Sequence, residues 1–420
     1  MPYSWLDRRL LSALQTAAGS VPVRLALGQK TEALEDDGSR RSDSRSSDRV
    51  LDPPLVWIKN RRSILALLRN PAISFGDLYS AGDLEVEGDL VHLLEQLYRI
   101  PNTAARRMIS RIGSWIPSNS LGASRRNIHH HYDLSNEFYS WWLDSQMIYT
   151  CAYFPRSEAT LEEAQTAKLD LVCRKLWLKP GETVVEAGCG WGALALHMAK
   201  NYGVRVKAFN ISHEQILFAR ERAEREGLGG QVEFCEDDYR NICGPADAFV
   251  SVGMLEHVGR SHYRDLGRVM HRVIGNQGRG LMHFIGRNFP RPLNAWIRKR
   301  IFPGGYPPVL HEALEILEPH DFSVLDVENL RLHYARTLEC WLGRFERSYD
   351  LVAERFGDTF ARMWRLYLAG SIAGFRTGTM QLFQVVFAGK ACDGRPWTRE
   401  YLYNSREAKG RDAEWTHAMS

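Results

Sequence analysis

The chain has 420 residues, of which 44% are hydrophobic and 25% charged, with a formal net charge of +4. This length exceeds one ordinary hydrophobic core, so we expect two domains. No apolar run approaches the roughly 20 residues of a membrane span, and the N-terminus MPYSWLDRRLLSALQ lacks the apolar core of a signal peptide. We therefore expect a cytoplasmic protein whose contact with a membrane would be peripheral.

The seven cysteines are scattered and contain no C-x-x-C pair. This favours reduced thiols over a disulfide framework or a zinc site. Three adjacent histidines at 129–131 cannot all face one ion, and no other ligand set joins them. We predict no metal site.

The first 110 residues are predicted to form a small α+β domain. We expect strands in VPVRLAL and PPLVWIKN, a short helix in SILALLRN that ends at Pro71, and turns with an amphipathic helix up to Ile100. Residues 35–48 are rich in Ser, Arg and Asp and lack apolar side chains, which predicts a flexible loop. A basic linker at 111–127 follows.

Residues 128–395 are predicted to form the second domain, and 396–420 a tail. From Ala164 on, short apolar segments alternate with helical patterns, which is typical of a doubly wound α/β sheet. The region from Arg291 is less regular, and we expect an appendage that covers the active-site end of the sheet. The expected strands are ETVVEAG, VRVKAFNI, QVEFCEDDY, DAFVSVG and RGLMHFIG.

A glycine-rich turn, GCGWG, follows the first of these strands. Its glycines would let the backbone bend and let a ligand approach a helix N-terminus. The turn is neither a dinucleotide G-x-G-x-x-G motif nor a P-loop. Glu186 could bind the cationic end of a ligand, Asn210 follows the second strand, and Asp237 or Asp238 could meet an adenine amine. S-adenosylmethionine fits this pattern; a purely structural turn is the alternative.

Acid and histidine side chains are expected at the carboxyl ends of the next strands. SVGMLEHVG presents Glu256 and His257, LMHFIG presents His283, and the later segment RLHYARTLECW adds Tyr334. A single histidine near a strand end is more often structural than catalytic. An acid and a histidine on adjacent strands, beside a methyl-donor site, favour a catalytic site.

Several of these motifs together resemble the cyclopropane-fatty-acyl-phospholipid synthase family. The resemblance implies a Rossmann-like class I methyltransferase sheet with a small α+β N-terminal domain. It implies methyl transfer from S-adenosylmethionine to the cis double bond of a phospholipid acyl chain, then closure of a cyclopropane ring with the help of a bound bicarbonate ion. The motifs, which run from about Ile128 to Gly389, are HYDLSNEFYSWWLDSQMIYTCAYF, GCGWGALALHMAK, SVGMLEHVG, NAWIRKRIFPGGYPP and HYARTLECWLGRF.

The resemblance also implies roles for individual residues. In the bicarbonate pocket, His283 and Tyr334 would donate hydrogen bonds and Glu256 would accept the bicarbonate hydroxyl, while Cys151 and Ile285 would contribute through their backbones. With Glu186, the expected donor-site residues are Tyr149, Thr150, Gly188, Gly190, Asn210, Gln215 and Asp238. Candidates for the aromatic lining of a dry acyl pocket are Tyr132, Phe138, Trp141, Tyr149 and Tyr153.

The expected partners are an unsaturated phospholipid and, peripherally, the inner face of the cell membrane, with anionic lipid favoured and no nucleic acid. Basic residues interleaved with aromatics motivate the membrane contact. A homodimer through the N-terminal domain is implied by the family alone. The basic and aromatic residues are Arg287, Phe289, Arg291, Trp296, Arg298, Lys299, Arg300 and Phe302.

Three positions depart from the family pattern. Glu186 stands where aspartate is usual, Phe209-Asn210-Ile211 replaces a glycine-containing turn, and Ser371 stands where some members have cysteine. These departures leave open a methylene- or methyl-branched product, or methylation of a diunsaturated chain. Two different hypotheses are small-molecule N-methylation and a non-enzymatic lipid-binding role, and the second predicts no binding of S-adenosylmethionine.

Overall fold

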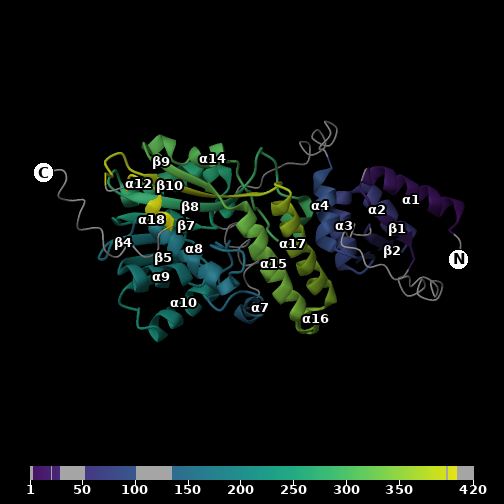
Figure 1. Ribbon diagram of the computed structural model, residues 1–420, viewed down its shortest axis with the longest axis horizontal. Coiled ribbons are helices and arrows are strands. Elements are labelled where there is room, and N and C mark those ends of the chain that lie inside the picture. The colour runs from purple at the N-terminus through teal and green to yellow at the C-terminus, as the bar shows by residue number, and fades with distance from the viewer. Residues whose placement is uncertain (1–2, 20, 29–52, 101–134, 394–395, 404–420) are drawn as a thin grey trace. The chain divides into compact units, whose positions relative to one another are not determined.

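The computed structural model describes residues 3–19, 21–28, 53–100, 135–393 and 396–403 (Figure 1). The predictions for 35–48, 111–127, 129–131, Tyr132 and the tail beyond 403 lie outside the described residues. The described residues fall into two compact units. Unit 1 holds those up to 100 together with 292–303 and 335–380, and unit 2 holds 135–291, 304–334 and those from 381 on. Each unit therefore combines segments that are far apart in the sequence, and the predicted domain limits remain predictions.

Unit 1 contains a three-stranded sheet in the order β1-β2-β3. β1 (Arg24–Leu27) runs parallel to β2 (Leu55–Ile58), and β3 (Leu84–Glu87) pairs antiparallel with β2. The first two strands agree with the sequence-based expectation. β3 is not predicted, because four residues are too few to establish a period.

Polar caps fix where the helices of unit 1 begin. Ser4 and Asp7 form a capping box at the first helix, and Asn60 and Asp89 cap two others. Pro71 ends one helix and begins the next, which the sequence does not predict. The helices are α1 (Trp5–Ala18), α2 (Arg61–Arg69), α3 (Pro71–Ser80), α4 (Leu90–Arg99), α13 (Ala295–Arg300), α16 (Tyr349–Phe356) and α17 (Asp358–Arg376), with most of α15 (Arg331–Arg347).

The late helix α17 packs against α3 and α4. The Nε–H of Arg362 donates to the Tyr79 carbonyl over 2.6 Å, and the Arg376 guanidinium lies 3.0 Å from a Glu95 oxygen. Trp364 and its apolar neighbours on α17 are buried. The early strands and helices therefore share their core with residues from far downstream.

Unit 2 is built on a seven-stranded sheet in the order β6-β5-β4-β7-β8-β10-β9. The five strands from β6 to β8 are parallel, and β10 is antiparallel to both of its neighbours. Because β5 and β7 flank β4, the order reverses there, and ligands bind such sheets at this carboxyl edge. The bounds are β4 (Thr183–Ala187), β5 (Arg205–Asn210), β6 (Val232–Glu236), β7 (Ala248–Val252), β8 (Arg279–Gly286), β9 (Ser323–Asn329) and β10 (Gln381–Ala388).

Two hydrophobic clusters cover the two faces of this sheet. Val184 belongs to the cluster under α8, α9 and α10, whereas the next residue, Val185, belongs to the cluster under α12. Figure 1 shows α9 and α10 together beside β4 and β5. The helices and turns are α7 (Asn136–Ser140), α8 (Leu161–Lys175), α9 (Ala193–Tyr202), α10 (His213–Arg225), η2 (Tyr239–Asn241), α11 (Leu255–Val258), η3 (Arg260–His262), α12 (Tyr263–Ile274), α14 (Leu310–Leu314), η4 (Glu318–His320) and α18 (Glu400–Tyr403).

The sheet confirms the predicted doubly wound α/β fold, with all five expected strands. The expectation of a simple appendage after Arg291 is wrong, because β9 and β10 from this region complete the same sheet. Their sequences carry acids and glutamines among the apolar residues, which obscures the strand pattern. None of the described helices is long and apolar enough to cross a membrane.

Replacing either of two helical glycines of unit 1 by alanine should have opposite effects on stability. A Cβ at Gly76 in α3 would lie 2.4 Å from the buried Trp296 ring, whereas a Cβ at Gly370 in α17 would make an ordinary 3.7 Å contact with Tyr98. Gly76→Ala should lower the free energy of unfolding by about 1–3 kcal/mol. Gly370→Ala should be neutral or stabilise by up to about 1 kcal/mol. Thermal unfolding followed by circular dichroism tests this, and equal melting temperatures would contradict it.

Candidate functional site

The turn after β4 combines three glycines with positive φ, at +85°, +53° and +84° for Gly188, Gly190 and Gly192. A Cβ at Gly192 would lie 2.6 Å from the Phe234 ring, and one at Gly188 would lie 3.1 Å from Met254. A Cβ at Gly190 would meet no heavy atom of the described residues within 4 Å. Gly190 is therefore the position of this turn where a ligand can approach the backbone.

Glu186 ends β4 next to this turn and is 2% exposed. Its Oε2 has no hydrogen-bond partner within the described part of the chain. Burial raises the pKa of Glu186 to about 8, and the nearby Lys168 ammonium partly opposes this shift. A buried, unpaired carboxyl oxygen beside an open backbone position fits a cationic ligand group.

The predicted ribose-side residues contact each other. The amide nitrogen of Asn210 donates to the Gln215 side-chain oxygen over 2.7 Å and to the Gly190 carbonyl over 3.3 Å. The Gln215 amide nitrogen is buried and unpartnered among the described residues. Because an amide nitrogen is a donor, Gln215 can serve a hydroxyl or ether oxygen of a ligand beside Gly190.

Asp238 is buried, but both its oxygens accept hydrogen bonds from the Arg240 guanidinium, at 3.1 and 3.0 Å. Asp237 accepts from the Asp238 N–H and from the Asn241 amide. An adenine amine that bound to Asp237 or Asp238 would share the carboxylate with these partners. The predicted adenine contact therefore remains a prediction.

Helix α8 holds the segment that carries Tyr149 and Thr150. Gln165 donates to the Thr150 carbonyl over 2.9 Å, and the Lys168 ammonium lies 3.0 Å from the Thr150 hydroxyl. Lys168 is 2% exposed and is not among the residues predicted from the sequence. A lysine in an amphipathic helix ordinarily points to solvent, so only the packing of α8 shows that this one is buried.

An aromatic cluster stands behind the glycine turn. The Tyr139 ring lies 5.5 Å from Tyr149 and 5.0 Å from Trp191, between ring centroids, and the Trp191 indole donates to the Asn136 side chain over 2.7 Å. The predicted lining residue Phe138 belongs to this cluster and is fully buried.

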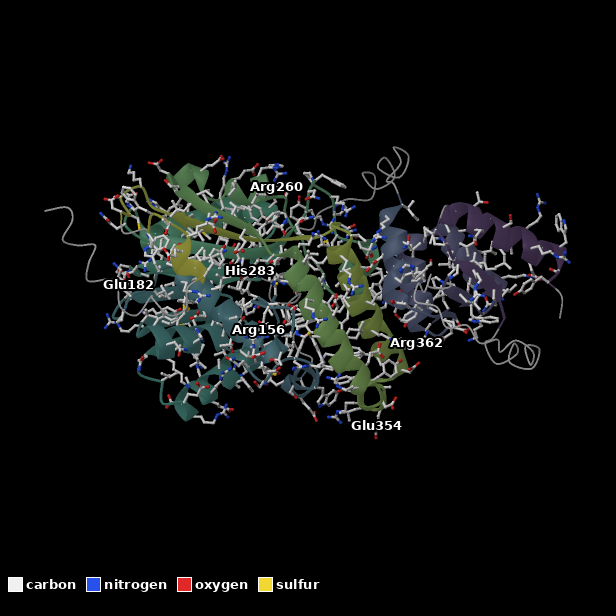
Figure 2. All side chains as sticks on the ribbon, viewed as in Figure 1. Arg156, Glu182, Arg260, His283, Glu354 and Arg362 are labelled. Atoms are coloured by element: carbon white, nitrogen blue, oxygen red, sulfur yellow. The ribbon has the colours of Figure 1, made fainter. Side chains whose placement is uncertain are left out.

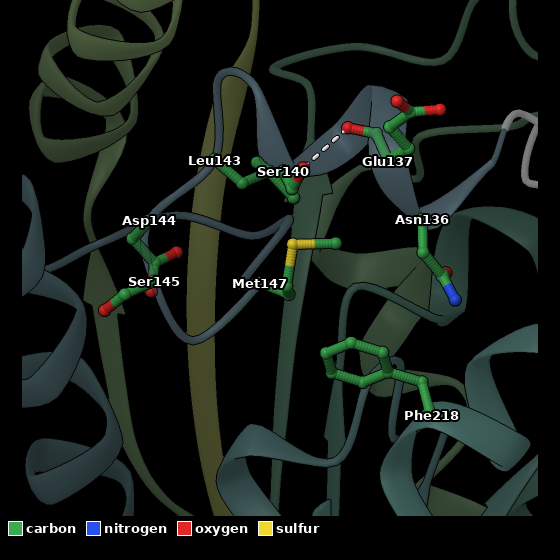
Figure 3. A pocket seen from close by; sticks show the side chains of 8 residues that line it. All are labelled: Asn136, Glu137, Ser140, Leu143, Asp144, Ser145, Met147 and Phe218. Carbon is green, nitrogen blue, oxygen red and sulfur yellow. Dashed lines mark hydrogen bonds between the residues drawn. The ribbon is translucent and has the colours of Figure 1, made fainter.

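A cavity of about 360 Å³ is lined by Asn136, the partner of Trp191, and by seven further residues (Figure 3). The Asp144 carboxylate at its edge accepts from the backbone N–H groups of Gln146 and Ile148, both at 2.9 Å, and so shapes the approach to Tyr149. None of the predicted site residues lines the cavity, which borders the site rather than forming it. Its lining consists of Asn136, Glu137, Ser140, Leu143, Asp144, Ser145, Met147 and Phe218.

Glu256 and His283 are buried at the carboxyl ends of β7 and β8 (His283 is labelled in Figure 2). The Ile285 N–H donates to Glu256 Oε1 over 2.5 Å, which leaves Oε2 without a partner among the described residues. Burial raises the pKa of Glu256 to about 7. His283 and Ile285 are two residues apart on β8, so their side chains share one face of the sheet.

The tautomer of His283 follows from its partner. The Gln384 amide nitrogen lies 3.0 Å from Nδ1, and because this nitrogen donates, Nδ1 accepts and the ring proton is on Nε2. Nε2 has no partner within the described residues. Burial lowers the pKa of His283 well below its ordinary value. His283 is therefore a neutral donor with a free N–H.

Cys151 and Tyr334 both contact Leu330, which lies at the same edge of the sheet. The Leu330 N–H donates to the Leu382 carbonyl on β10, opposite Ile285. The Cys151 sulfur lies 4.0 Å from the Leu330 carbonyl, and Tyr334 follows one helical turn later, where its N–H bonds that carbonyl. The structure thus brings all five residues of the predicted anion pocket to one end of β8 and β10.

The remaining candidates lie as follows. Tyr153 stacks on His333 at 4.8 Å between ring centroids, and Trp141 is half-buried. Burial lowers the pKa of His257 to about 4. Ser371 bonds the carbonyl one turn back in α17 of unit 1. No group of three or more potential metal ligands occurs in the described ranges.

Comparisons with known proteins identify relatives in sequence and in structure. Residues 119–385 match the family model described as mycolic acid cyclopropane synthetase. A cyclopropane-fatty-acyl-phospholipid synthase of Escherichia coli K12 is 35% identical over 80% of this chain and 88% of its own length. The tuberculostearic acid methyltransferase UfaA1 of Mycobacterium tuberculosis is 34% identical over 75% of this chain and 78% of its own.

Among solved structures, the mycolic acid cyclopropane synthase CmaA1 complexed with SAH and CTAB has a TM-score of 0.60 and 30% identity, covering 63% of this chain and 97% of that one. This likeness confirms the predicted class I methyltransferase fold. The SAH bound in that structure also supports S-adenosylmethionine as a ligand of this fold.

The glycines at 190 and 192 both have positive φ, so alanine costs some stability at either position, but its Cβ would meet different surroundings. Gly190→Ala should weaken S-adenosylmethionine binding by about tenfold, because its Cβ would fill the open approach. Gly192→Ala should lower the free energy of unfolding by about 1–3 kcal/mol, because its Cβ would overlap Phe234. Titration calorimetry and thermal unfolding of both variants test this. Unchanged affinity in Gly190→Ala would contradict the assignment.

Proposed function

The chain belongs to the mycolic acid cyclopropane synthetase family, and we propose that it converts a cis double bond in a phospholipid acyl chain into a cyclopropane ring. Methyl transfer from S-adenosylmethionine to unsaturated lipid follows from the family. The phospholipid substrate, the ring product and the assisting bicarbonate ion are the proposal. The observation that carries it is a pair of buried atoms at the edge of the sheet, Glu256 Oε2 and His283 Nε2, that have no hydrogen-bond partner among the described residues.

The donor side of the site is formed by residues around the glycine turn. Glu186 would face the cationic end of S-adenosylmethionine, Gln215 would donate to its sugar, and Gly190 would let it approach the backbone. When bound, S-adenosylmethionine supplies an electrophilic methyl group. An alkene is a weak nucleophile, so the contribution of the protein is to hold the double bond close and aligned.

Attack by the double bond leaves a positive charge on the acyl chain, which water would quench. Cys151 is fully buried, and Glu256, His283 and Tyr334 are at most 8% exposed, which supports a dry site. Aromatic faces stabilise such a charge by about 0.5–2 kcal/mol each without bonding to it. The ring of Tyr149 is one candidate, because the next residue, Thr150, is also an expected donor-site residue.

Closure of the ring requires removal of a proton from the new methyl group, and bicarbonate is the base that we propose. His283 Nε2–H and the Tyr334 hydroxyl would donate to the ion, and Glu256 Oε2 would accept its hydroxyl proton. The Ile285 N–H fixes the other Glu256 oxygen, so Glu256 orients the ion rather than acting as the base. A carboxylate facing an anion is favourable only with such a bridging proton.

The alternative within the same chemistry is a methylene- or methyl-branched product. The similarity to a tuberculostearic acid methyltransferase supports keeping this alternative. Cyclopropane and methylene products have the same mass, so the ring protons in the NMR spectrum of the isolated fatty acid distinguish them. Small-molecule N-methylation is the less favoured hypothesis, because the relative from Escherichia coli covers 80% of this chain and is named for a phospholipid substrate.

We further propose peripheral binding to the anionic inner face of the cell membrane, and dimerisation remains a suggestion from the family. The expected basic-aromatic stretch supports this only in part, since Arg287 and Trp296 are buried and Phe289 is exposed. α1 offers a second surface: Trp5 is 68% and Leu6 44% exposed, and the Arg9 guanidinium lies 4.7 Å from the Trp5 ring.

Glu256→Gln should reduce turnover by about 100-fold or more, because a neutral amide accepts the hydrogen bond of the bicarbonate hydroxyl more weakly than a carboxylate and would no longer hold the orientation of the ion. Wild-type turnover should fall as pH drops below about 7, where Glu256 becomes protonated. Labelled S-adenosylmethionine and unsaturated phospholipid vesicles provide the assay, with calorimetry for donor binding. Glu318→Gln, at an exposed glutamate, is the control. Retained turnover in Glu256→Gln with intact donor binding would refute the role.

The membrane surface is tested by the double variant Trp5→Ser, Leu6→Ser. It should co-sediment less with anionic vesicles than the wild type, while wild-type binding should weaken as salt increases. Donor binding should be unchanged. Leu351→Ser, at another exposed leucine, is the control. The proposal would be contradicted if co-sedimentation of the wild type with vesicles depended neither on salt concentration nor on lipid charge.

A further inference from the structure

α8 buries a lysine against the segment that leads from the donor site to the anion pocket. Lys168 is 2% exposed, and its Nζ lies 3.0 Å from the Thr150 hydroxyl. Gln165, one turn earlier, fixes the same segment through the Thr150 and Ile148 carbonyls, at 2.9 and 3.3 Å. The backbone position of Thr150 is therefore already held without the lysine.

The surroundings of Lys168 are unusual for a buried ammonium. Within the described residues no carboxylate oxygen lies within 4 Å of its Nζ, whereas Lys175, the other buried lysine of α8, has Glu328 at 2.5 Å and Asp326 at 3.6 Å. Lys168 instead interacts at longer range with several groups of unit 2. These are Asp144 before Thr150, Glu186 on β4, Cys151, Cys173 on α8 and His283 on β8.

Burial lowers the pKa of Lys168 to about 8, and Asp144 opposes this shift. Asp144 is occupied with two backbone N–H groups of its own loop. The carboxyl of Glu186, in contrast, has an oxygen without a partner in the described residues, and Lys168 is the cation that lowers the Glu186 pKa against its burial. Each of the two groups therefore favours the charged form of the other, against the effect of burial.

We propose that Lys168 is a positioning residue of the donor site, whose buried ammonium orients the Thr150 hydroxyl and favours the carboxylate form of Glu186 that the cationic donor would meet. This role rests on the proposed function, because it presumes S-adenosylmethionine at Glu186. The ammonium does not touch the reacting atoms. Its charge also disfavours a proton on His283, which keeps that ring a neutral donor.

The test measures S-adenosylmethionine affinity by calorimetry between pH 6.5 and 9.5 with the full chain. Wild-type affinity should rise with pH as Glu186 ionises near 8. Without the lysine charge, Glu186 should ionise at higher pH, so the midpoint should move up by about one pH unit. Lys168→Met should then bind up to about tenfold more weakly at pH 7.5, yet nearly as tightly as the wild type at pH 9.5.

Further variants separate charge from structure. Lys168→Gln keeps a donor for the Thr150 hydroxyl but no charge, so it should show the same shift; it serves as the test if Lys168→Met does not fold. Lys175→Met removes a lysine of similar burial and should lower the melting temperature without moving the midpoint. In the Glu186→Gln background, adding Lys168→Met should no longer change the pH dependence of binding. This control separates the titration of Glu186 from that of the donor's own amino group, which is present in both backgrounds.

An unchanged midpoint in Lys168→Met and Lys168→Gln would overturn the proposal. So would an equal loss of affinity at every pH, which is the result expected of a purely structural residue. If the wild type bound no S-adenosylmethionine, the proposed function itself would fail, and this outcome is distinct from the other two.

Discussion

The hydrogen bond from the Ile285 N–H to Glu256 joins the ends of β7 and β8 and determines the character of the site. It satisfies one oxygen of a carboxyl group that is otherwise out of water, and so makes its burial tolerable. The second oxygen and the His283 Nε2 are then left as an acceptor and a donor without protein partners in the described residues. Buried polar atoms of this kind are rare unless a ligand or water completes them.

The proposed reaction requires two opposite electrostatic environments in this part of the sheet. A positively charged donor and an alkene that becomes cationic require negative or aromatic surroundings, whereas a bound anion requires donors. The proposed groups for these two demands belong to strands on either side of β7: Glu186 belongs to β4, and His283 to β8. Thr150 and Cys151, which are consecutive residues, connect the two sides.

Much of unit 2 could be predicted from its sequence, because parallel strands buried on both faces give short apolar runs and the glycine turn is a local pattern. The sequence motifs also assigned Glu256, His283 and Tyr334 to one expected pocket, although these residues lie far apart in the chain. β9 and β10 could not be predicted, since polar residues such as Gln384 are buried by contacts with distant partners. Lys168 was not predicted for the same reason. Its burial depends on tertiary packing, and the pattern of polar and apolar residues in α8 does not indicate it.

The division of the chain among the two units has a consequence for its synthesis. α17 completes the core around α3 and α4, and unit 1 ends only at Met380. When residues up to 100 have been synthesised, only part of this unit is present, and its core is completed only after residues 335–380 have followed. Domains usually fold in order as they are made. Here the amino-terminal segment must be protected from aggregation while all the parallel strands of unit 2 are translated.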